Sequence, residues 1–154
     1  MIELNSLIQP DCILHPLKGT EPQSVIRELV ELLHDRGHVQ DPDETIALVW
    51  AREQQRSTGI GDGLAVPHGR CPSLKKVVAA IGWTDTPIDF KAADGAPVNL
   101  VVLIISPTED TTGHVQALGA ISRVLGSRDV RTAARQCQSA EALHALLCSE
   151  SESA

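Results

Sequence analysis

The sequence predicts a single α/β domain with a mixed β-sheet flanked by helices on both faces. Segments with helical spacing of apolar residues alternate with short strand-like segments, which favours this fold class. The run Val98 to Ser106 is nearly continuous in aliphatic residues, as is typical of a strand covered on both faces. The length of 154 residues fits one domain, and a hydrophobic content of 42% suffices for its core. We expect the domain to span residues 1–148 and the acidic residues 149–154 to form a flexible tail.

The helices are predicted from apolar periodicity and from capping residues. Thr20 is a candidate cap for the first helix, and Asp41 with a following proline is a candidate cap for the second. Val115 is expected on the buried side of the third helix. The four predicted helices are Thr20 to Gly37, Pro42 to Gln55, Thr111 to Leu125 and Ser139 to Cys148.

Three segments predict strands because they are short and rich in aliphatic residues. Leu64 to Val66 is the shortest, Val77 to Trp83 carries small residues, and Val98 to Ser106 is the longest. Helices therefore precede, separate and follow the strands, as the predicted fold class requires.

Composition excludes several classes of function. Thirteen Lys and Arg against 20 Asp and Glu leave a net charge of −7, which argues against nucleic-acid binding. The longest apolar run, Leu100 to Ile105, is too short for direct membrane insertion, and Met1 to Asn5 lacks the pattern of a secretory signal. We therefore expect a cytoplasmic protein. The four cysteines form no CxxC pair, so we expect reduced thiols and no metal site.

The run Ser57 to Arg70 carries the densest chemical signal. It contains four of the eleven glycines of the chain, and Pro67-His68-Gly69 follows the short predicted strand. A histidine held between proline and glycine at a strand end is well placed for a site. Gly59, Gly61 and Gly63 recur at every second residue, so they match neither a dinucleotide fingerprint nor a P-loop. The alternative is a turn-rich connection with a surface histidine.

A second histidine, His114, begins the helix that follows the long aliphatic strand. If that strand lies beside the Leu64 to Val66 strand, His68 and His114 meet at one sheet edge. The chain has no G-x-S-x-G or H-E-x-x-H motif, but a neutral histidine can itself be a nucleophile for phosphoryl transfer. Arg52, Arg56 and His114 are candidates to stabilise phosphoryl oxygens. His34 and His38 are expected to be solvated.

The run Thr58 to Gly69 resembles the active-site signature of the enzyme IIA domains of the fructose–mannitol type. These domains belong to the bacterial phosphoenolpyruvate-dependent phosphotransferase system and include its nitrogen-regulatory branch. Further matching segments follow in the expected order, so that the resemblance covers about residues 5–147. They are Arg52-Glu53, Thr86 to Phe90, Val98 to Pro107, and His114 with Leu118 and Ile121.

This resemblance implies one α/β domain and a phosphohistidine carrier. His68 would accept a phosphoryl group at Nε2 from the carrier HPr or its nitrogen-branch counterpart, and pass it to a cysteine of an enzyme IIB domain. By the same resemblance, Arg52 and His114 would stabilise the phosphoryl oxygens, with no metal, nucleotide or other cofactor. The residues expected to form the loop that a partner approaches are Gly59, Gly61, Gly63, Pro67 and Gly69.

Two alternatives belong to other functional classes. One is a non-catalytic regulator that acts on target proteins by contact; the other is a metal- or nucleotide-dependent enzyme built on the same loop. With no enzyme IIB or membrane domain in the sequence, we expect a free-standing IIA unit. The Thr-Gly-Ile-Gly sequence favours the regulatory branch.

Overall fold

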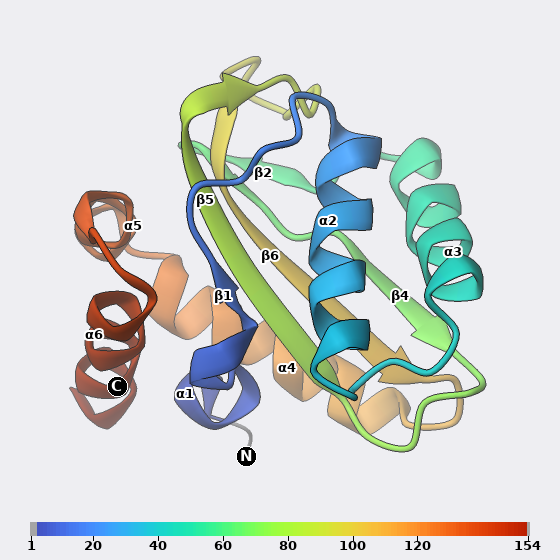
Figure 1. Cartoon of the computed structure of the whole chain (residues 1–154). Helices are drawn as coiled ribbons and strands as arrows, with labels where there is room; N and C mark the ends of the chain where they lie inside the picture. Colours follow the sequence, from blue (N-terminus) through green and yellow to red (C-terminus); the bar gives the residue numbers. More distant parts are fainter. Residues whose placement is uncertain (1–2, 154) are drawn as a thin grey trace.

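The computed structural model describes residues 3–153, with side chains described as far as residue 150. A six-stranded sheet lies between two layers of helices, and β5 and β6 run through its centre (Figure 1). The strand order is β1-β5-β6-β3-β2, with β4 also paired to β6. The strands are β1 (Ile13–Leu14), β2 (Gly59–Gly61), β3 (Leu64–Ala65), β4 (His68–Cys71), β5 (Val78–Ile88) and β6 (Val98–Pro107).

The sheet is mixed, as predicted. β5 is antiparallel to β6, whereas β3 and β4 both run parallel to β6 along its other side. β6 therefore has partners on both edges over most of its length, and cores on both of its faces bury its side chains, which explains why its sequence is nearly continuously apolar.

Helices cover both faces of the sheet, which confirms the predicted fold class. Helices α2 and α3 pack on one face, and α4 runs behind the sheet (Figure 1). Helices α1, α5 and α6 join α4 in the second core cluster. The helices are α1 (Leu4–Leu7), α2 (Pro22–Asp35), α3 (Pro42–Gln55), α4 (Thr111–Leu125), α5 (Arg128–Gln136) and α6 (Ala140–Ser153).

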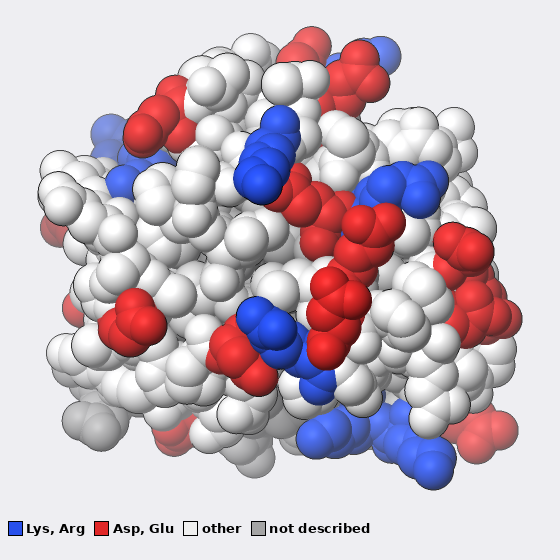
Figure 2. Space-filling model, in the orientation of Figure 1, with Lys and Arg blue, Asp and Glu red and all other residues white. Residues whose placement is uncertain are grey.

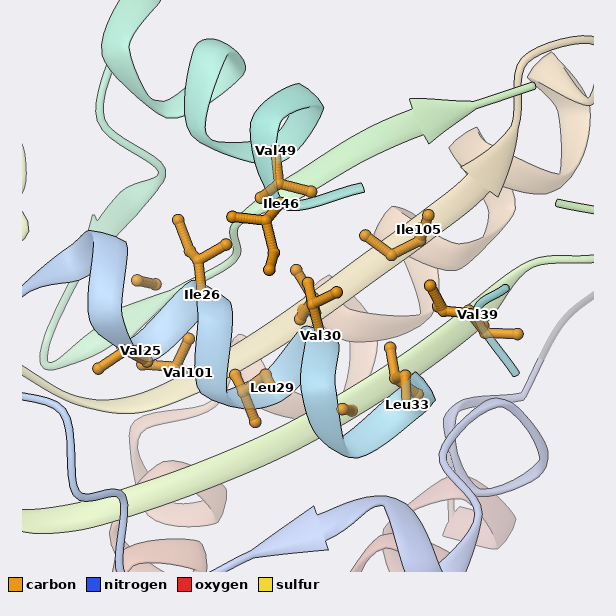
Figure 3. Packing of buried hydrophobic residues seen from close by; sticks show 14 of the residues in the cluster. Val25, Ile26, Leu29, Val30, Leu33, Val39, Ile46, Val49, Val101 and Ile105 are labelled. Carbon is orange, nitrogen blue, oxygen red and sulfur yellow. The ribbon is translucent and has the colours of Figure 1, made fainter. Parts of the chain in front are cut away.

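Alternate side chains of β6 supply the two cores. Val101 and Ile105 point toward the apolar stripe of α2 (Figure 3). Val49 of α3 belongs to the same cluster. Leu100 and Val102 belong to the opposite cluster under α4. This alternation follows from the two-residue period of a strand, and it anchors the end of β6 from which the candidate site is built.

The predicted helices agree closely with the structure. Asp41 caps α3 by accepting a hydrogen bond from the Glu44 N–H at 3.0 Å. For α2 the predicted cap was wrong: Glu21, not Thr20, is the N-cap, in a reciprocal capping box with Ser24. The Glu21 N–H donates to the Ser24 hydroxyl at 3.2 Å, and a helix beginning at Pro22 leaves Thr20 outside.

The predicted burial of Val115 on α4 was also wrong, because its side chain is 62% exposed. The buried face of α4 runs through Gly113, Ala117 and Ala120, so the position midway between the first two points outward.

The sequence patterns predicted the two-residue β3 but missed α1, β1, β2, β4 and α5. Strands β1, β2 and β4 have two to four residues, too few to show a period. Helix α5 is rich in arginine and buries only Val130, Arg131 and Ala134. Helix α6 continues to Ser153, past the predicted domain limit at residue 148. The expected flexibility of residues 149–154 stays a prediction, since helical geometry does not measure mobility.

Within the described chain, none of the helices is both long and apolar enough to cross a membrane. Figure 2 shows acidic and basic side chains interspersed on the face that carries α2 and α3. All four cysteines are free thiols, as predicted.

Candidate functional site

His68 lies where the chain resumes its pairing with the central strand. β3 and β4 both pair with β6, and Pro67 separates them. Proline has no N–H to donate, but its carbonyl accepts a hydrogen bond from the Ile104 N–H at 3.1 Å. His68 therefore opens β4, shortly after β3 ends, whereas the sequence analysis placed it directly after a strand.

The backbone fixes the protonation pattern of the His68 ring. Nδ1 of His68 lies 2.8 Å from the carbonyl oxygen of Val66. A carbonyl can only accept, so Nδ1 carries the hydrogen and donates it. In the neutral ring, Nε2 is then the nitrogen with the free lone pair.

His114 lies beside His68, as predicted from the sheet edge. The two ring centroids are 5.4 Å apart and the rings are tilted by 52°. Asp110 caps α4 by accepting a hydrogen bond from the Gly113 N–H at 2.8 Å, which fixes the turn that carries His114. Nδ1 of His114 is 2.7 Å from the hydroxyl of Ser106, a fully buried residue near the end of β6.

Cationic side chains surround a hollow of about 620 Å³ that His68 lines. Arg52 and Arg56, from the end of α3, line it together with Lys91 from the loop after β5. An Nη1 of Arg52 donates to the carbonyl of Arg56 at 2.9 Å, which orders the arginine at the rim. The structure thus gathers His68, His114 and Arg52 in one region, and adds Lys91.

Burial lowers the pKa values of both histidines. For His68, burial acts first and the positive charge of Arg52 adds to it, against the opposing hydrogen bond to Val66. For His114, burial is again the main cause of the lowered pKa, followed by His68 and Arg70. Both rings are therefore neutral near pH 7, and a neutral His68 is a nucleophile.

The loop before His68 is held by a buried carboxylate. Glu53, at the end of α3, is 8% exposed and accepts hydrogen bonds from the Thr58 N–H at 2.9 Å and the Thr58 hydroxyl at 2.5 Å. Gly59 follows directly, and a Cβ there would lie only 2.7 Å from Cβ of Ala92. The loop is thus held by α3 through Glu53 and by the loop between β5 and β6 through Ala92.

The predicted loop residues do not all border the hollow. Gly59 lines it, whereas Gly61 and Gly63 lie at the β2–β3 turn, where both have positive φ. Gly69 packs against Val49, and a Cβ at this glycine would lie 3.0 Å from a methyl carbon of that valine. Gly59 and Gly69 therefore permit close packing within the chain, and Gly61 and Gly63 permit a turn with positive φ. The approach of a partner to this loop stays a prediction.

Sequence reasoning missed three contributors: Ser106, Lys91 and the Glu53–Thr58 pair. Ser106 carried a usable signal, because it is a polar residue near the end of an otherwise aliphatic strand. Lys91 carried none, since its position depends on how the loop after β5 folds back over β2.

Comparisons with known proteins point to one family. Residues 6–150 match the model of the family "Phosphoenolpyruvate-dependent sugar phosphotransferase system, EIIA 2". The chain is 31% identical to a nitrogen regulatory protein of Bradyrhizobium diazoefficiens over 94% of each chain. It is 31% identical to a fructose-specific EIIA component of Haloferax volcanii over 81% of each chain.

A solved structure of a nitrogen regulatory protein has a similar fold. The crystal structure of nitrogen regulatory protein IIA-Ntr from Neisseria meningitidis superposes with a TM-score of 0.85 at 27% identity, covering 93% of this chain and 97% of that one. The chain belongs to the EIIA 2 family of the phosphoenolpyruvate-dependent sugar phosphotransferase system.

Proposed function

We propose that this chain is a phosphohistidine carrier in which Nε2 of His68 accepts the phosphoryl group. The observation that carries the proposal is the 2.8 Å hydrogen bond from Nδ1 of His68 to the Val66 carbonyl, in a ring that burial keeps neutral. The donor is phospho-HPr or its nitrogen-branch counterpart. The acceptor is a cysteine of an enzyme IIB domain, or the phosphoryl group stays on His68 as a regulatory signal.

The transfer needs no metal, nucleotide or other cofactor. The lone pair on Nε2 of His68 attacks the phosphorus of the donor phosphohistidine, and the donor P–N bond breaks as the new one forms. Its electron pair returns to the donor nitrogen. The positive charge that develops on the His68 ring is stabilised by the Nδ1–H bond to Val66. In the second step a partner thiolate attacks the same phosphorus and Nε2 leaves.

Arg52 and His114 are proposed to bind the phosphoryl oxygens. Arg52 carries a permanent positive charge at the hollow. A neutral His114 can donate from Nε2 only if its Nδ1 accepts, so Ser106 must be the donor in the 2.7 Å bond between them. Ser106 is thus a positioning residue, because its hydroxyl sets the tautomer of His114.

Exposed apolar side chains mark the surface that a protein partner would meet. Ile60 lines the hollow and is 58% exposed, and Val115, next to His114, is 62% exposed. A carrier must release its partner after each transfer, so a small and transient interface suits the role. We expect this exchange to take place in the cytoplasm.

The identity with a nitrogen regulatory protein along nearly the whole length of both chains supports the regulatory branch. There, the phosphoryl group would change how the chain contacts its targets by adding negative charge beside Arg52 and Lys91. A non-catalytic regulator that acts by contact alone is the second candidate, favoured by the exposed Ile60 and Val115.

An intact-mass assay distinguishes the candidates. The purified chain is incubated with phosphoenolpyruvate, enzyme I and HPr, or with the nitrogen-branch counterparts. We expect one acid-labile phosphate on the wild type and none on His68→Ala, and the faster donor set identifies the branch. No phosphate from either cognate donor set would leave the contact regulator as the function.

A further inference from the structure

A second cluster of chemically active side chains lies where the chain turns from α2 toward α3. A carboxylate oxygen of Asp11, Sγ of Cys12 and a ring nitrogen of His38 all lie within 4.8 Å of one another. Among residues 3–150, whose side chains the structure describes, this is the one group of three or more such side chains placed so closely. The cavity beside it has no lining residue in common with the hollow at His68.

Two well-fixed segments bring the three side chains together. Asp11 and Cys12 belong to a short 3₁₀-helix, Pro10–Cys12. His38 follows the end of α2, where Gly37 has a φ of +83° and the His38 N–H bonds to the Leu33 carbonyl at 2.9 Å. The backbone therefore holds His38 firmly beside Cys12, although the whole of α2 separates the two residues in the sequence.

A side-chain bond ties the same two segments. Nε of Arg36 donates to the carbonyl oxygen of Asp11 at 3.0 Å. The same nitrogen lies 4.0 Å from Oδ2 of Asp11, which leaves Oδ1 directed to the thiol of Cys12 at 3.5 Å. Oδ1, Sγ and the imidazole therefore remain as the facing ligand atoms.

The three side chains differ in exposure. Cys12 is 1% exposed, whereas Asp11 is exposed and His38 is half-buried. A cation would bind the sulfur of Cys12 as a thiolate, so its binding would release the thiol proton. Lys75 and Lys76 line the neighbouring cavity and oppose a cation there, so the three ligands themselves must provide the affinity.

We propose that Asp11, Cys12 and His38 form a binding site for Zn²⁺ or a cation of the same class. Sulfur, imidazole nitrogen and carboxylate oxygen are the ligand set that zinc prefers. Bond lengths of about 2.0 to 2.3 Å place tetrahedral ligand atoms roughly 3.5 Å apart, so closing the site needs movements of about 1 Å. The cysteine spacings predicted no metal site, and His38 was expected to be solvated, because the contact of His38 with Cys12 forms only in the folded chain.

Three protein ligands leave a fourth position, and the structure provides room for it. A cavity of about 460 Å³ is lined by Cys12 and His38 together with Glu3, Ser6 and Gln9. A water molecule, or the carboxylate of Glu3, can complete the coordination from this side. A bound metal would then link the N-terminal segment to the end of α2. This link would also hold α2 against the core that it covers.

Cobalt titration of the full chain tests the site, because a Co²⁺–thiolate bond gives a strong near-ultraviolet absorption band. We expect the band to saturate at one Co²⁺ per chain and to be displaced by Zn²⁺. It should be lost in Cys12→Ser and weakened at least tenfold in affinity in His38→Gln. The half-exposed position of His38 lets this second variant fold normally, and circular dichroism confirms the folding of both variants.

The chain offers a matched control. Cys148 and His144 form a second cysteine–histidine pair on α6, with Sγ and Nδ1 3.7 Å apart, outside the three-ligand group. The double variant Cys148→Ser/His144→Gln should keep the full cobalt band. A band that survives Cys12→Ser, disappears in the α6 double variant, or never forms in the wild type would overturn the proposal.

Discussion

His68 and His34 have the same ring geometry and opposite surroundings. Nδ1 of His34 lies 2.7 Å from the Val39 carbonyl, just as Nδ1 of His68 lies 2.8 Å from the Val66 carbonyl. In its neutral form, a ring with this hydrogen bond presents a free Nε2 lone pair. His34, however, is exposed near the end of α2, whereas His68 is partly buried beside His114 in a hollow with Arg52 and Lys91.

The tautomer alone therefore does not make a phosphorylation site. A phosphoryl group brings negative oxygens, and only the surroundings of His68 provide cations and donors to meet them. Removing those surroundings step by step should make His68 behave more like His34.

The largest difference is expected between variants that lack His68 and variants that lack His34. His68→Ala should abolish phosphorylation, because the accepting nitrogen is gone, whereas His34→Ala should keep the wild-type rate and one phosphate per chain. Intact mass after incubation with the donor proteins measures both. Phosphate that survives in His68→Ala would show that the acceptor lies elsewhere.

Removing the neighbouring ring should slow the transfer without preventing it. His114→Ala eliminates one donor to the phosphoryl oxygens, for which we expect a loss of about 10²-fold in rate by analogy with oxyanion-stabilising groups. Rapid-quench kinetics with a saturating donor gives the rate. An unchanged rate would remove His114 from the site.

A smaller effect is expected from removing the hydroxyl of Ser106, which contacts His114 and not the phosphoryl group. Ser106→Ala leaves His114 in place but frees its tautomer, for which we expect a loss of about tenfold in transfer rate, within the range of a single hydrogen bond. The ¹⁵N chemical shifts of the His114 ring supply the independent readout, since they should report a change from the Nε2–H to the Nδ1–H form. Normal shifts with a reduced rate would indicate a purely structural role for Ser106.

The smallest effect concerns pH. The pKa of His68 is lowered from 6.5, chiefly by burial, so the ring stays neutral below the pH at which an unfolded histidine takes up a proton. The unfolded chain then binds more protons than the folded one, and the free energy of unfolding should decrease as pH falls below about 6.5.

Urea unfolding of the wild type and His68→Ala between about pH 7.5 and 5.5, on either side of the ordinary histidine pKa, measures this contribution. We expect a steeper decrease in the wild type, and equal slopes would contradict the lowered pKa. The rate of phosphorylation should likewise keep its full value to below pH 6.5, since the neutral nucleophile persists.

The sequence predicted the parts of the molecule that depend on local signals. Asp41 and the apolar stripe of α3 located that helix to the residue, and the aliphatic run of β6 identified the central strand. His68 was found because a proline and a glycine flank it within a distinctive loop. Each of these features can be predicted from residues that are close together in the sequence.

The remaining features depend on tertiary placement. Lys91 enters the hollow from a loop that follows His68 at a distance along the chain, and Cys12 meets His38 across the end of α2. Strand β4 has only four residues and forms because β6 offers an unpaired edge beyond Pro67. These contacts join residues that are far apart in the sequence, so the periodicity of apolar residues does not predict them.

The most direct test of the central claim is to identify the phosphorylated nitrogen. Two-dimensional ¹H–¹⁵N spectra of ¹⁵N-histidine-labelled protein, recorded before and after phosphorylation, distinguish Nε2 from Nδ1 in each ring. We predict phosphorus coupling at Nε2 of His68. Nδ1 should keep its proton and still donate it to the Val66 carbonyl. Phosphorylation at Nδ1 of His68, or on the ring of His114, would contradict the account.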